Sequence, residues 1–285
     1  MIKIIIGIVV LLLLLMVGII FFDTHRFVTK EMTMRSEKIK QDATFVVLAD
    51  MHNKSFGKEN EKLLQKIREI DPDMILIAGD MLNAKPGADF SKTAAFLKRL
   101  AEEYKIIYGM GNHEHRISLY PEVYGSMKQD YWNAIKHENI IPLVNEKIEF
   151  EKNGIVIYGS QIDKRFYKRF KLQKMEESYL PKLLGECKEK YFNILLAHNP
   201  DYFENYAAWG ADLVLSGHVH GGIVRLPFLG GVISPACRLF PKYDGGIFRE
   251  GRSTMLLSRG LGSHTIPVRM FNPGELHVIH LKSEK

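Results

Sequence analysis

The segment ADLVLSGHVHGG, residues 211–222, is the stretch of this chain that decides its fold. It begins as a short apolar run typical of a buried strand, and it ends in His218 and His220 between glycines. In an extended segment alternate side chains point to the same side, so both imidazoles can reach one crevice while Val219 points away. Glycine lets the backbone pass close to a ligand. A strand that ends in this way indicates a binding site at the edge of a sheet.

Earlier segments repeat the pattern of an apolar run that ends in polar residues. Strand-like runs cover residues 44–50, 73–80 and 105–115, and they alternate with residues 57–70 and 90–104, where apolar residues recur at helical spacing. Strands and helices that alternate through short joints are typical of βαβ units. The sequence therefore predicts an α/β fold in which helices cover a largely buried sheet.

The second half of the chain continues this pattern with more antiparallel character. Residues 148–160 predict a hairpin that turns at Asn153-Gly154, and residues 192–198 predict another strand. Residues 245–281 are expected to form antiparallel strands.

Composition sets broad limits on the protein class. The 285 residues are 46% hydrophobic, which excludes general disorder, and the net charge of +6 favours an anionic partner. Two cysteines, Cys187 and Cys237, are too few for a disulfide framework, and whether they pair is left open.

The N-terminus predicts a membrane anchor. Residues 4–22 carry no charge and are nearly all aliphatic, which is long enough to cross a bilayer and longer than the apolar part of most cleaved signal peptides. We expect an anchor over residues 1–22, a tether or first exposed helix over 23–41, and the catalytic domain over 42–285. The Lys and Arg residues on the two sides of the span give conflicting signals, and an extracytoplasmic domain is favoured because only Lys3 precedes the span.

Polar residues that follow the strands are the candidate metal ligands. The carboxyl ends of parallel strands face one crevice, so we expect these loops to converge. The candidates are Asp50, His52, Asp80, Asn112, His198, His218 and His220. Nitrogen and oxygen donors without cysteine suit Mn, Fe, Zn or Ni, and seven ligands are too many for one tetrahedral site. Two divalent ions that share a ligand fit this set better.

The ordered motifs ADMH, GDMLN, GNHE, AHNPD and GHVHGG resemble those of the calcineurin-like metallophosphoesterases. The resemblance covers residues 44–282 and is nearest to a membrane-anchored branch with exported phosphoesterases and UDP-2,3-diacylglucosamine hydrolase-like proteins. It implies an α/β sandwich with mixed sheets covered by helices.

The resemblance also implies a role for each site residue. Asp50, His52, Asp80 and His220 would hold one ion, and Asp80, Asn112, His198 and His218 the other. His113 would protonate the leaving oxygen or stabilise the transition state, and Glu114 would orient the imidazole of His113.

These features predict a metal-dependent phosphoesterase in which a hydroxide shared by two ions attacks phosphorus. A lipid-linked or nucleotide phosphate is the expected substrate class, with the bilayer as a partner and no nucleic acid. Arg225, Arg252, Arg259 and His264 are the candidate substrate contacts, and the basic, aromatic segment 163–175 could contact anionic headgroups. A nuclease of the same fold and a non-catalytic metal-binding scaffold remain the alternatives. Oligomeric state is left open.

Overall fold

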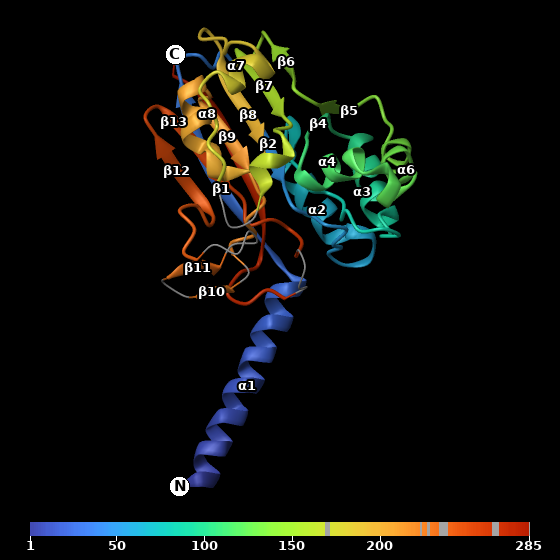
Figure 1. Cartoon of the computed structure of the whole chain (residues 1–285), viewed down its shortest axis with the longest axis vertical. Helices are drawn as coiled ribbons and strands as arrows, with labels where there is room; N and C mark the ends of the chain where they lie inside the picture. The colour runs from blue at the N-terminus through green and yellow to red at the C-terminus, as the bar shows by residue number, and fades with distance from the viewer. Residues whose placement is uncertain (169–171, 223, 227–228, 234–238, 264–267, 285) are drawn as a thin grey trace.

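Two six-stranded sheets pack face to face in the computed structural model, and helices cover their outer faces (Figure 1). The structure describes residues 1–168, 172–222, 224–226, 229–233, 239–263 and 268–284. Within these ranges there is also a two-stranded ribbon formed by β10 (Val224–Leu226) and β11 (Gly230–Ile233). The predicted α/β sandwich with mixed sheets is confirmed.

The first sheet has the strand order β1-β14-β2-β3-β4-β5. Its strands are β1 (Phe27–Ser36), β2 (Ala43–Leu48), β3 (Met74–Ala78), β4 (Ile106–Gly109), β5 (Ile140–Leu143) and β14 (Gly274–Ser283). β2 to β5 are parallel, whereas β14 runs antiparallel to β2. Strand periodicity divides their side chains between two cores: Val46 and Leu48 pack under the helices, while Phe45 and Val47 pack between the sheets.

The second sheet has the strand order β12-β13-β9-β8-β7-β6. Its strands are β6 (Glu146–Phe150), β7 (Ile155–Ser160), β8 (Phe192–Ala197), β9 (Leu213–Ser216), β12 (Gly246–Glu250) and β13 (Ser253–Leu257). The four central strands are parallel, and the edge strands β6 and β12 are antiparallel to their neighbours. The hairpin predicted at Asn153-Gly154 is confirmed as β6–β7. The tail is only partly antiparallel, because β13 pairs in parallel with β9.

Helices and short helical turns form the outer layers. The first sheet is covered by α2 (Glu61–Ile70), α3 (Ser91–Ala101), α4 (Asn112–Leu119), α5 (Pro121–Tyr124) and α6 (Met127–Ala134), and the second by α7 (Tyr179–Leu184) and α8 (Phe203–Trp209). The 3-10 turns are η1 (Lys58–Asn60), η2 (Lys164–Tyr167) and η3 (Pro200–Tyr202). The strand expected over 105–115 ends at Gly109, because the carboxylate of Glu114 accepts a hydrogen bond from Gly111 N and starts α4.

Residues 27–36 correct the expected tether. They form β1, which pairs in parallel with β14 along its whole length. Met32 and Met34 pack against the core between the sheets, which explains why this polar segment is an edge strand and not a free linker.

Helix α1 (Ile2–His25) projects from one end of the layered domain (Figure 1). It is long and apolar enough to be a membrane span or a signal sequence. Its last turn is attached to the domain: Asp23 Oδ2 accepts a hydrogen bond from Asn272 N at 3.1 Å, and Thr24 Oγ1 accepts one from Arg269 N at 3.2 Å. The position of the helix relative to the domain is therefore fixed by hydrogen bonds as well as by chain connectivity.

Candidate metal centre

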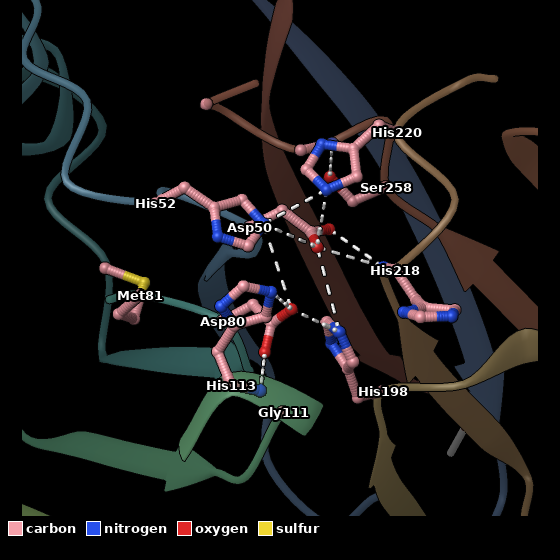
Figure 2. Close-up of polar contacts among 12 residues, drawn as sticks. Asp50, His52, Asp80, Met81, Gly111, His113, His198, His218, His220 and Ser258 are labelled. Atoms are coloured by element: carbon pink, nitrogen blue, oxygen red, sulfur yellow. Dashed lines mark hydrogen bonds and ion pairs between the residues drawn. The ribbon is translucent and has the colours of Figure 1, made fainter. Parts of the chain in front are cut away.

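The loops after β2, β3, β8 and β9 and the start of α4 bring the predicted ligands together beyond the carboxyl ends of these strands (Figure 2). Donor atoms within 4.8 Å of one another define three groups: Asp50, His52 and His220; His52, Asp80 and His113; and Asp80, His198 and His218. The first and third groups correspond to the two ligand sets expected from the sequence. Most of these side chains are buried.

Asp80 belongs to both the second and the third of these groups. Its Oδ1 accepts a hydrogen bond from His113 N at 2.8 Å, which fixes the carboxylate. Its Oδ2 lies 3.1 Å from His198 Nε2 and 3.8 Å from His52 Nε2. One oxygen of Asp80 is therefore committed to the backbone, and the other faces an imidazole of each expected set.

Asp50 has an equivalent position on the other side of the centre. Both of its carboxylate oxygens accept the His218 N–H at 3.0 Å, and Oδ1 lies 3.3 Å from His220 Nε2. The Nε2 atoms of His52 and His220 are 3.1 Å apart. At this distance the two rings share an N–H···N hydrogen bond when one Nε2 carries a proton, and both lone pairs are open to a cation when neither does.

The backbone of the centre is strained. Five of the seven candidates have a backbone φ in the left-handed region, which residues with a Cβ rarely adopt. They are Asp50 (49°), His52 (46°), Asp80 (56°), His218 (73°) and His220 (52°). Such residues cost about 1–3 kcal/mol each and cluster at functional sites. The surrounding hydrogen bonds and packing must compensate for this cost.

Two glycines permit the close approach of these loops. A Cβ at Gly111 would lie 2.1 Å from Asp80 Oδ1, and a Cβ at Gly217 would lie 2.2 Å from Asp50 Oδ2. Any larger residue at either position would displace a candidate ligand.

The electrostatics of the centre favour bound cations. Burial raises the pKa of Asp50 to about 7. Burial would also raise the pKa of Asp80 and lower that of His198, but their mutual attraction outweighs it. The pKa of Asp80 therefore lies well below its usual range, and that of His198 rises to about 10. In the absence of another cation, the protonated imidazole of His198 supplies the positive charge beside the carboxylate of Asp80.

The donor set fits divalent ions. Asn112 Oδ1 is buried and has no hydrogen-bond partner among the described residues. A buried carbonyl oxygen without a donor is costly, and coordination to a cation removes that cost. Together with the carboxylates and imidazoles, it completes a set of oxygen and nitrogen donors suited to transition metals.

His113 lies beside Asp80 and is held by the backbone. Ala84 N donates to His113 Nδ1 at 2.7 Å, so in the neutral ring the proton is on Nε2. That Nε2 lies 3.8 Å from Asp80 Oδ2. The structure therefore directs a proton-bearing nitrogen toward the centre.

The expected role of Glu114 is corrected. Its four acceptor positions are filled by Asp80 N, Met81 N, Gly111 N and the hydroxyl of Tyr108, at 2.8–3.0 Å. Burial raises its pKa. Since these donors saturate the carboxylate, Glu114 holds the loop that carries Asp80, and the Ala84 amide orients the His113 ring.

The predicted substrate contacts lie at different distances from the candidate metal centre. Arg225 pairs with Asp244 at 2.9 Å, and Arg259 Nε donates to Glu275 at 2.7 Å, so both guanidinium groups are held near the His220 loop by carboxylates. Arg252 precedes β13 at the opposite end of the sheet from the centre, beside Gly210, and that expectation is wrong. His264 lies outside the described residues, as does Cys237.

Sequence reasoning missed Arg269 and Asn272. Arg269 is 4% exposed and donates to the carbonyls of Arg259, Gly260 and Gly262, in a loop whose Gly262 N–H binds Asp50 O. Burial lowers its pKa to about 10. Asn272 Nδ2 donates to His220 O at 2.7 Å. The segment VRMFNP, residues 268–273, contains no motif that would have indicated either role.

This chain resembles known proteins over most of its length. A family model described as calcineurin-like phosphoesterase matches residues 43–222. YpbG of Bacillus subtilis is 26% identical over 260 residues, which cover 90% of this chain and 86% of YpbG. An uncharacterized metallophosphoesterase of Campylobacter jejuni is 28% identical over 90% of this chain and 63% of its own length. Phosphodiesterase YaeI of Escherichia coli is 27% identical over 68% of this chain and 65% of YaeI.

This chain therefore spans less than two thirds of the last two relatives. Among solved structures, TT1561 of Thermus thermophilus has a TM-score of 0.46 and 15% identity, with coverage of 78% of this chain and 92% of that one.

Proposed function

Because this chain belongs to the calcineurin-like phosphoesterase family, we propose that its centre binds two divalent ions and hydrolyses a phosphoric ester. The observation that carries this proposal is the placement of Asp80 Oδ2 between imidazoles of both ligand sets. One set would comprise Asp50, His52, Asp80 and His220, and the other Asp80, Asn112, His198 and His218.

The residues around the ions have separate tasks. When bound, the ions would supply Lewis-acid charge to the phosphoryl oxygens and make water nucleophilic at neutral pH. His113 Nε2 would donate a proton to the leaving oxygen, while its Nδ1 stays bound to Ala84 N. Glu114 keeps the backbone of Asp80 and Met81 in place during the reaction.

We assign α1 to a retained membrane anchor. No residue of the helix's apolar window is buried, and its buried Asp23 binds Asn272, a residue that also binds the carbonyl of His220. Exposed apolar side chains on neighbouring loops support a membrane at this end of the domain: Leu226, Leu229, Leu239, Phe240, Val268 and Phe271. The extracytoplasmic side and the membrane-anchored branch of the family stay predictions from the sequence.

This attachment favours a lipid-linked phosphate over a soluble nucleotide as substrate. Hydrogen bonds link the end of α1, through Asn272, to the loop of His220, so the centre is held at a fixed distance from the bilayer that α1 would span. A substrate confined to that surface would meet the centre without three-dimensional diffusion.

Metal content and hydrolysis measured together test the proposed function. The full-length protein in detergent, loaded with Mn, Fe, Ni or Zn, should contain two ions per chain and hydrolyse p-nitrophenyl phosphate or bis-p-nitrophenyl phosphate. Asp80→Asn should lose both ions and at least 100-fold in rate, because its shared oxygen loses its charge. Asp130→Asn, on the exposed face of α6, is the matched control. Two bound ions without hydrolysis of either ester would favour the alternative of a non-catalytic metal-binding scaffold.

A further inference from the structure

A cavity of about 300 Å³ adjoins the candidate metal centre. It lies between α4 and η2, and its lining residues are Asn112, His115, Arg116, Leu119, Tyr120, Lys164, Tyr167 and Lys168. Its size is at the lower limit for small-molecule sites, which suits one part of a substrate.

The cavity connects with one side of the centre. Asn112 belongs to its wall and is also a candidate metal ligand. Tyr167, on the opposite wall, packs its ring edge-on against the imidazole of His218, with 5.2 Å between the ring centroids. A group in the cavity would therefore adjoin a phosphate held by the Asn112, His198 and His218 side.

The cavity is strongly cationic. Arg116, Lys164 and Lys168 line it, and in the described part of the chain none of the three lies within ion-pair distance of a carboxylate. Lys164 Nζ donates to the hydroxyl of Tyr120 at 3.1 Å, and this hydrogen bond raises the pKa of Lys164 further above neutrality. The carboxylate of Asp163 acts on Lys164 from beyond ion-pair distance, and three cations around one cavity attract an anion.

A second cavity, lined by residues 172–178 and 201–205, has the opposite character. It has a volume of about 510 Å³, and its wall carries the carboxylates of Glu176, Glu177, Asp201 and Glu204 with Lys174 as its one cation among the described residues. The concentration of positive charge beside Asn112 is therefore a local feature and does not follow from the net charge of the chain.

We propose that the cavity beside Asn112 binds a second anionic group of the substrate, a phosphate or a carboxylate. This inference rests on the proposed hydrolysis at the adjoining centre. The segment 163–175 was expected to contact lipid headgroups, and the structure places its Lys164, Tyr167 and Lys168 on the cavity wall. Lys164 and Lys168 would thus be specificity-determining residues, and the preferred substrates would carry a charge beyond the hydrolysed phosphate.

A matched pair of substrates tests this role. 3-Phosphoglycerate and glycerol 3-phosphate differ only in a carboxylate that replaces a hydroxymethyl group. With the Mn-loaded full-length protein in detergent, kcat/KM should be higher for 3-phosphoglycerate. Lys164→Ala and Lys168→Ala should each reduce this preference about tenfold, through KM, because a charge-assisted hydrogen bond is lost. Lys174→Ala, in the same segment and exposed on the acidic cavity, is the control and should retain the preference.

The outcomes separate the two proposals. Equal kcat/KM for both substrates in the unaltered protein, or a preference that survives both substitutions, overturns the anionic subsite and leaves the hydrolase intact. Absence of hydrolysis of every ester by the metal-loaded protein contradicts the proposed function itself. A loss confined to Lys164→Ala and Lys168→Ala supports the subsite.

Discussion

Asp80 and Glu114 have different roles in the centre: Asp80 is a candidate metal ligand, and Glu114 holds the loop that carries it. Asp80 follows a strand, and that position makes it a candidate ligand in the sequence. Glu114 was also singled out, but its partners were not, because the amides of Asp80 and Met81 lie more than 30 residues away in the chain. A side chain's type and place in a motif can be read from the sequence, whereas its hydrogen-bond partners depend on tertiary structure.

Substitution of the two neighbours in α4 should separate chemistry from metal binding. His113→Gln should keep both ions and lower kcat by about 10²–10⁴-fold, since it removes a proton donor. Glu114→Gln should lower the metal content, because an amide NH₂ would face backbone N–H groups and release the loop of Asp80. Metal analysis beside steady-state kinetics distinguishes the variants. Equal metal loss in both would contradict these separate roles.

At the scale of elements, the prediction succeeded where local pattern determines structure. The central strands are continuous apolar runs and the hairpin has an Asn-Gly turn, so both were predicted. β1 was missed because its sequence FVTKEMTMRS is largely polar and its partner β14 is about 250 residues away. The parallel pairing of β13 with β9 was missed for the same reason: pairing partners distant in sequence leave no local pattern.

The loops that end these strands should not tolerate even one added methyl group. Gly111 has an ordinary negative φ, so Gly111→Ala introduces no backbone strain, but its Cβ would contact Asp80 Oδ1 at 2.1 Å. We expect loss of at least one ion and at least a tenfold lower rate, with unchanged circular dichroism. Gly18→Ala in α1, where nothing lies within 4 Å, should change neither. Full metal content in Gly111→Ala would show that the loops can separate.

At the scale of the whole molecule, the anchor and the centre form one connected unit. Residues 269–272 bind the end of α1 on one side, and on the other they bind the carbonyls of His220 and Gly260. The ribbon β10–β11 begins shortly after His220 and lies at the end of the domain from which α1 projects (Figure 1). A bilayer around α1 would therefore face this ribbon and its apolar side chains.

Contact of that ribbon with lipid can be measured by quenching. Leu239, bridged to β11, is 67% exposed. Lys152, in the exposed turn between β6 and β7, lies at the end of these strands opposite to the ligand loops. In nanodiscs with brominated acyl chains, full-length Leu239→Trp should show quenched fluorescence beyond that of the native tryptophans, because an apolar side chain at the interface reaches the acyl boundary. Lys152→Trp should not. Equal quenching in both variants would mean that α1 does not orient the domain as the hydrogen bonds to Asp23 and Thr24 require, and the preference for a lipid-linked substrate would lose its support.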